Sequence, residues 1–173
     1  GFGVASRIES LVLVIFYALS SVIGPFVGQN LSAGCETRIQ EALRLCALFC
    51  LASGLVIAAL LGLSAGFLPT LFSQNPDVTD VTRLFLWLAP ISYGAYGVVM
   101  VMNAAFNGLG KPMPAVYISA TRMLVMYLPL AILGRHWFGI SGIFGAYAVA
   151  NVLSGLLSYF WAQRTASSLS DMP

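Results

Sequence analysis

The chain has 173 residues, of which 59% are hydrophobic and 8% are charged. Roughly a quarter of the residues in a soluble domain are charged, so this composition excludes an ordinary water-soluble fold. The formal net charge of +2 is spread along the chain, which excludes the dense basic patch of a nucleic-acid-binding protein. The sequence predicts an all-α integral membrane protein whose surroundings are the lipid bilayer.

The hydrophobic runs predict about five membrane spans, since one span with its loop uses roughly 25 to 35 residues. The fourth and fifth runs are separated by a short Gly134–Gly139 turn, so they should form an antiparallel hairpin. The polar residues 165–173 predict a short, disordered tail. In chain order, the predicted spans cover residues 4–27, 43–72, 81–106, 114–133 and 140–161.

The basic residues predict the orientation of the bundle. The predicted loops at residues 28–42 and 107–113 lie on the same side of a five-span bundle as the tail. The positive-inside rule places that side, with the carboxy-terminal tail, in the cytoplasm. The amino terminus would then lie outside, so we expect the chain to be a fragment that lacks preceding helices. The basic residues on the cytoplasmic side are Arg38, Arg44, Lys111 and Arg164.

The residues that usually carry metal or catalytic chemistry are few and poorly spaced. Three cysteines and one histidine do not have the spacing of a disulfide framework or of a zinc site. The sequence also offers no paired acids and no nucleophile beside a base, which disfavours a membrane-embedded enzyme. We therefore expect no enzyme activity, no metal ion and no cofactor.

A polar motif follows the first span. Residues 27–34 read VGQNLSAG, and Gly28 and Gly34 bracket a turn where the helix leaves the membrane. Glycine permits the left-handed backbone that such exits use, and Gln29 and Asn30 can cap the exposed carbonyl groups. We expect a helix stop and a tight cytoplasmic hinge here. A role in gating is the alternative.

Three charged residues lie in or near predicted spans, where charge is expensive and is usually paired or faces a water-filled cavity. Arg7 and Glu9 are two residues apart, so they lie on different helix faces and cannot simply neutralise each other. Glu9 is either solvated at the outer interface, paired with an absent helix, or placed in a cavity to attract a cation or take up a proton. Arg122 lies near the middle of the fourth span, and a Glu9–Arg122 contact is a further hypothesis.

The third span carries a stripe of residues that suits organic cations. Tyr93, Tyr96, Met100 and Asn103 follow helical spacing along one face. Aromatic faces attract cations and methionine adapts to varied shapes, so the stripe is a candidate cation pocket. Ordinary packing between helices is the alternative for the tyrosines. In the fifth span, we assign the small residues Gly142 and Gly145, and Asn151 with them, to helix packing.

Four segments follow one another in the order of a known family's motifs. Residues 6–11 read SRIESL, residues 27–34 read VGQNLSAG, residues 71–78 read LFSQNPDV, and residues 107–112 read NGLGKP with Gly108 and Gly110. Their order and placement between hydrophobic spans resemble the MATE (multidrug and toxic compound extrusion) family of efflux transporters. That family has two six-helix lobes. The resemblance implies that this chain forms most of the second lobe, with the missing first lobe as its partner.

The resemblance implies secondary active efflux of drugs or organic cations from a bacterial inner membrane, by antiport against Na⁺ or H⁺ as two lobes rock around a cavity. NorM-type relatives place an acidic coupling residue in the third span, which lacks aspartate and glutamate here. The coupling ion is therefore expected to bind largely in the first lobe, and the fragment alone should be inactive. A lipid-linked sugar flippase of the same superfamily, or a non-transporting truncated membrane protein, are the alternatives.

Overall fold

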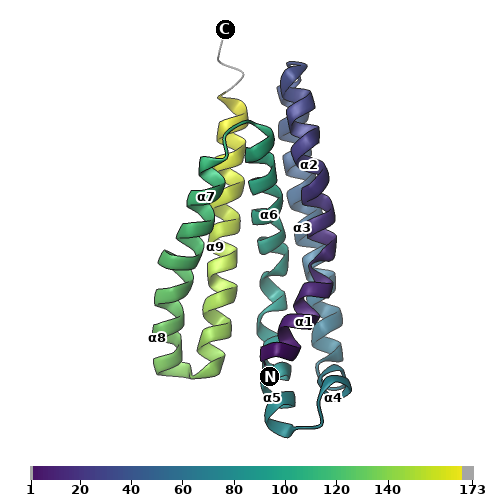
Figure 1. The fold of residues 1–173 in the computed structure, drawn as a ribbon, viewed down its shortest axis with the longest axis vertical. Helices are drawn as coiled ribbons and strands as arrows, with labels where there is room; N and C mark the ends of the chain where they lie inside the picture. The colour runs from purple at the N-terminus through teal and green to yellow at the C-terminus, as the bar shows by residue number, and fades with distance from the viewer. Residues whose placement is uncertain (1, 169–173) are drawn as a thin grey trace.

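Long helices run up and down along one axis in the computed structural model, which describes residues 2–168 (Figure 1). Five helical runs are long and apolar enough to cross a membrane. The prediction of an all-α membrane protein with five spans is therefore confirmed. The elements are α1 (Phe2–Val12), α2 (Val14–Ser32), α3 (Glu36–Ser64), α4 (Leu68–Phe72), α5 (Pro76–Leu88), a 3₁₀ turn (Pro90–Ser92), α6 (Tyr93–Gly108), α7 (Met113–Ala120), a π-helix (Thr121–Tyr127), α8 (Leu128–Phe138) and α9 (Ile140–Ser167).

The predicted loop at residues 28–42 is much shorter in the structure, because α2 continues to Ser32 and α3 begins at Glu36. Gly28, Gln29 and Asn30 are helical, and the Asn30 side chain donates to the Phe26 carbonyl at 2.8 Å inside the helix. The predicted bounds of this loop were wrong because the α2 backbone stays helical through these residues, where the Asn30 side chain bonds within the helix. Arg38 and Arg44 accordingly lie within the first turns of α3.

The turn after α2 ends the helix with a glycine, as predicted for one of the two bracketing positions. Gly34 has φ +69°, where a side chain would be strained. The Gly34 N–H donates to Leu31 O at 3.1 Å and the Cys35 N–H donates to Asn30 O at 2.9 Å. These two bonds form a Schellman motif, which satisfies carbonyl groups at the helix end.

The turn after α6 repeats this geometry. Gly110 also has φ +69°, the Gly110 N–H donates to Asn107 O at 3.1 Å, and the Lys111 N–H donates to Phe106 O at 3.0 Å. Gly108 is the last residue of α6, and its backbone lies against Gly24 so closely that a side chain would not fit. The two motif-bearing helix ends are therefore packed together at the same end of the bundle, where α9 also ends (Figure 1).

The predicted hairpin between the last two spans is present, but its turn is a single residue. Helix α8 continues to Phe138, and Gly139, with φ +62°, directly precedes α9. The Gly134 backbone touches Gly142, so the two glycines allow α8 and α9 to pack closely at the hairpin. Among residues 2–168, no atom lies within 4 Å of the Cβ position of Gly145, so that residue takes no part in the predicted seam.

The carboxy-terminal end of the bundle is more ordered than the predicted tail implies. Helix α9 extends through residues 165–167, and its Gln163 side chain donates to the Gln40 carbonyl of α3 at 3.2 Å. The rest of the predicted tail, residues 169–173, lies outside the described residues.

Helix α6 is the centre of the packing, since it contacts α2, α3 and α9 over much of its length. Small residues make this possible. A methyl group at Gly54 of α3 would overlap the Gly94 backbone, and one at Gly155 of α9 would lie 2.9 Å from Ala95 O. Large side chains fill the remaining space, with Phe16 and Met102 fully buried. Van der Waals packing of this kind, and not water exclusion, holds membrane helices together.

We expect Gly54→Ala to lower the free energy of unfolding by about 1–3 kcal/mol, because the added methyl group forces α3 away from α6. Gly62→Ala on the same helix is the matched control, since no atom lies near its Cβ position and stability should be unchanged or slightly higher. Thermal unfolding of the detergent-solubilised protein measures both. Equal effects of the two substitutions would contradict this packing.

Candidate functional site

A cavity of about 260 Å³ contains the two membrane-embedded charges that the sequence singled out. We call it the Glu9–Arg122 cavity. It lies between α1, α5, α6, the π-helix and α9, so segments from both ends of the chain form its wall. The residues with polar side chains that line it are Glu9, Tyr96, Arg122, Tyr127, Tyr147 and Asn151.

Glu9 is positioned by α1 and held by α9. Its Oε1 accepts a hydrogen bond of 2.6 Å from the Tyr147 hydroxyl, and the side chain is half-buried. A hydrogen bond to a charged group is short and strong. The Tyr147 ring is fixed in turn by an edge-to-face contact with Tyr127, with 6.1 Å between ring centres. Of the three placements considered from the sequence, the structure shows Glu9 in the cavity.

Arg122 is held by a relay of polar groups across three elements. Its Nη1 donates to Asn151 Oδ1 at 2.9 Å, and the Asn151 Nδ2 donates to Ser92 Oγ at 3.0 Å. The guanidinium also lies over the Tyr96 ring, 4.7 Å from its centre, which is a cation–π contact. Arg122 Nε is buried and has no hydrogen-bond partner among the described residues. Asn151 therefore connects the charge on the π-helix to the 3₁₀ turn.

A π-helix presents Arg122 to the cavity. Pro129 follows it and has no N–H, so the carbonyl four residues earlier lacks its usual helical donor. The backbone responds with wider hydrogen bonding, seen in the Leu128 N–H, which donates to Met123 O five residues back. Short π-helical segments occur frequently at functional sites. The sequence shows Pro129 as a possible bend but gives no signal for the wide turn.

Glu9 and Arg122 face the same cavity and each has its own neutral hydrogen-bond partner. Arg122 is close enough to interact electrostatically with the Glu9 carboxylate. No direct ion pair between Glu9 and Arg122 forms among residues 2–168, so the hypothesised contact stays a prediction for the two opposite charges that face this cavity. With both groups charged, their charges cancel, which lowers the cost of holding them inside a membrane.

The four residues of the predicted cation stripe on α6 lie in different surroundings. Of its four residues only Tyr96 lines the cavity, and Arg122 lies over its ring. Tyr93 is fully buried, and its hydroxyl has no hydrogen-bond partner among the described residues. Met100 packs against the core, and Asn103 donates to Ser119 Oγ at 3.2 Å. The stripe is covered because α6 is the central helix, so the alternative of helix packing holds for most of it.

Arg7 is exposed on α1 and does not line the cavity. Tyr147 and Asn151 are the residues that sequence reasoning missed. They lie four apart on one face of α9, in a stretch assigned to packing because of its small residues. An asparagine inside a membrane span, next to a tyrosine on the same face, was the available signal.

The chain is similar in sequence to known membrane transporters. A family model described as MatE matches residues 1–133. The "FAD transporter" of Shewanella oneidensis is 36% identical over 163 residues, which cover 94% of this chain and 36% of that protein. The "Probable multidrug resistance protein YpnP" of Bacillus subtilis is 27% identical over 144 residues, which cover 83% of this chain and 32% of that protein.

The fold is similar to that of a solved transporter. The Vibrio cholerae MATE transporter VcmN, in its bent form, matches with a TM-score of 0.91 and 34% identity over 97% of this chain. The match covers 39% of the VcmN chain. This chain therefore spans well under half the length of the relatives it matches.

Asn151→Ala should destabilise the protein by about 1–2 kcal/mol, because it leaves Arg122 and Ser92 without their partner. Asn107→Ala is the control, since Asn107 is exposed at the end of α6. Thermal unfolding in detergent measures both variants. If Asn151→Ala unfolds at the same temperature as the control, the relay does not hold Arg122.

Proposed function

Because the chain belongs to the MATE family of membrane transporters, we propose that the whole protein exports organic cations and drugs in exchange for Na⁺ or H⁺. Members of this family are transporters and not enzymes. The chain supplies about five spans of the whole, so the first lobe and the rocking of two lobes come from sequence outside it.

The observation that carries the proposal is the Glu9 carboxylate inside the Glu9–Arg122 cavity. Charge at membrane depth is costly, and a carboxylate facing a cavity is a substrate or proton site by default. Tyr147 donates to one Glu9 oxygen, and a carboxylate has about four acceptor positions, so further sites remain for a proton or an organic cation. The Tyr127 and Tyr147 rings add aromatic surface that attracts cations.

Competition between a proton and an organic cation for Glu9 would couple inward movement of the proton to export of the cation. An organic cation binds the ionised carboxylate, and a proton that neutralises Glu9 removes the attraction and favours release of the cation. Arg122 adds to this effect, because the cavity becomes positive when Glu9 is protonated and then repels the organic cation. A ligand that shifts the equilibrium must bind the two states differently, and this change of charge provides the difference. If Na⁺ is the coupling ion, we expect it in the first lobe, as the third span lacks acids.

Flavin nucleotides are a second candidate class of substrate. The S. oneidensis relative is named an FAD transporter. FAD combines an aromatic ring system with an anionic diphosphate, and Arg122 beside three tyrosines offers one cation and aromatic surface. An anion would bind best with Glu9 protonated, which is the reverse of the preference of a cation.

We further propose an orientation in a bacterial inner membrane. Helices α2, α6 and α9 end, and α3 and α7 begin, at the same end of the bundle (Figure 1). Arg38, Arg44, Lys111 and Arg164 belong to these segments. The positive-inside rule favours a cytoplasmic location for this end.

In a drug-sensitive bacterium without its own exporters, we expect the full-length protein to export ethidium and Glu9→Gln to lower the rate by about tenfold or more. The estimate follows from losing one charge-assisted contact. Glu41→Gln is the matched control, because Glu41 is exposed on α3 outside the cavity. Fluorescence of cell-bound ethidium reports the rate, with protein in the membrane verified by blotting.

Ethidium retained by cells that contain the wild-type protein would contradict cation export. In that case, release of FAD into the medium by wild-type cells, and its loss in Arg122→Gln, would support the flavin candidate. Equal export by Glu9→Gln and wild type would remove the role of the carboxylate.

A further inference from the structure

A second cavity, of about 520 Å³, lies between α3, α6 and α9 and is more apolar than the Glu9–Arg122 cavity. We call it the α3–α6–α9 groove. Gly54, Gly94 and Gly155 line it where α6 packs closely against α3 and α9. Its walls include Leu51 and Leu156, which are 47% and 53% exposed. The groove is thus an open apolar depression on the surface of a membrane-spanning bundle.

The groove has a positive charge near one end. Arg44 lines it on α3, eight residues after the helix begins at Glu36, or roughly 12 Å along the axis. This is the end of the bundle at which the basic residues gather. The opposite direction along the groove is lined by apolar residues such as Leu55 and Ile91. One end therefore suits an anion and the rest suits hydrocarbon.

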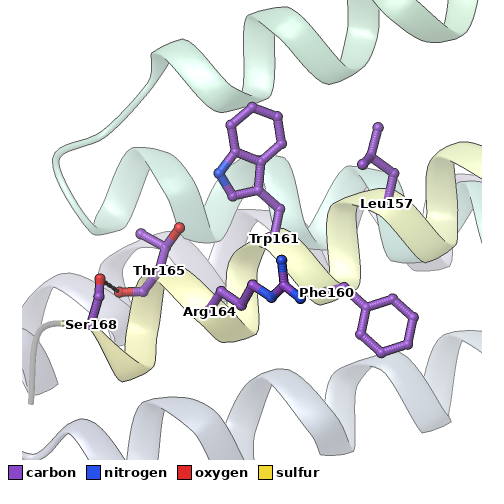
Figure 2. Close-up of a pocket in the computed structure, with 6 residues that line it drawn as sticks. All are labelled: Leu157, Phe160, Trp161, Arg164, Thr165 and Ser168. Atoms are coloured by element: carbon purple, nitrogen blue, oxygen red, sulfur yellow. Dashed lines mark hydrogen bonds between the residues drawn. The ribbon is translucent and has the colours of Figure 1, made fainter.

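A third cavity, of about 450 Å³, adjoins this end of the groove at Phe160, which lines both (Figure 2). Figure 2 shows Trp161 and Arg164 extending from the last turns of α9, with Thr165 and Ser168 beyond them. The Gln163–Gln40 hydrogen bond holds α9 against α3 at this level. Arg44 and Arg164 therefore flank the same end of the groove from two helices.

Neither guanidinium has a hydrogen-bonding or ion-pairing partner among residues 2–168, and both side chains are exposed. Arginines with open donors on two neighbouring helices suit a phosphate, which accepts two parallel hydrogen bonds from one guanidinium. Trp161 lines the same third cavity as Arg164, and its ring centre lies 6.1 Å from that of Phe106. Tryptophan is enriched at the level of lipid headgroups.

We propose that the α3–α6–α9 groove binds one acyl chain of an anionic phospholipid whose phosphate lies between Arg44 and Arg164. Basic pockets between membrane helices bind anionic headgroups on the cytoplasmic side. The arrangement of charge and apolar surface selects this occupant over another helix, which has no phosphate to meet the two arginines. The lipid site is separate from the Glu9–Arg122 cavity, so it does not depend on which substrate the protein exports.

Native mass spectrometry of the full-length protein in detergent tests the proposal, with phosphatidylglycerol and zwitterionic phosphatidylcholine as probes. We expect phosphatidylglycerol to bind more tightly than phosphatidylcholine. Replacing Arg44 and Arg164 together by glutamine should weaken phosphatidylglycerol binding about 30-fold, the effect of two basic contacts near a membrane surface. Arg38→Gln with Lys111→Gln is the matched control, because it removes the same charge at the same end without altering the groove.

Leu51→Trp fills the groove and should weaken phosphatidylglycerol binding with both arginines intact, whereas Leu60→Trp on α3 lies outside it and should not. Equal loss in the two charge variants would mean attraction to the whole basic end and would overturn the site. Unchanged binding in Leu51→Trp would mean that no acyl chain enters the groove. A lower melting temperature or loss of a dimer in Leu51→Trp, with lipid binding unchanged, would assign the groove to another helix or a second copy.

Discussion

Arg122 carries its charge near the middle of the fourth span, where an unpaired arginine costs at least about 2.5 kcal/mol. The surrounding structure meets this cost. Tyr96 presents its ring to the guanidinium and Asn151 accepts from it, while Ser92 accepts from Asn151. The π-helix that carries Arg122 and the 3₁₀ turn at Pro90 both depart from α-helical geometry where this relay passes. Glu9 completes the balance of charge from α1.

Hydrophobic runs were sufficient to predict the fold class and the five spans, because membrane helices must satisfy their own backbone and so follow from length and composition. The ends of the helices were harder to predict. Polar residues such as Gln29 and Asn30 predicted an exit from the membrane, yet helical hydrogen bonds persist through them. Gly34 and Gly110 mark the ends of α2 and α6, because there the backbone takes a positive φ that closes a Schellman motif.

The site was predicted in part. Glu9, Arg122 and Tyr96 stood out in the sequence because charge and polar aromatic groups are unusual at membrane depth, and the structure brings them together. The sequence could not show that Tyr93 and Met100 pack in the core, because packing depends on which neighbours surround α6, and spacing along one helix does not contain that information. Tyr147 and Asn151 were missed for the same reason, since their partners lie 138 and 29 residues away in the sequence.

A double-mutant cycle tests most directly whether Glu9 and Arg122 act together in transport. Ethidium efflux would be measured for the full-length protein, Glu9→Gln, Arg122→Gln and the double variant, with protein levels matched. Coupled charges predict that the double variant departs from the product of the single effects by about fivefold or more, which corresponds to roughly 1 kcal/mol. A double variant whose loss equals the product of the two single losses would contradict coupling between Glu9 and Arg122, because two charges that share one cavity cannot be changed without effect on each other.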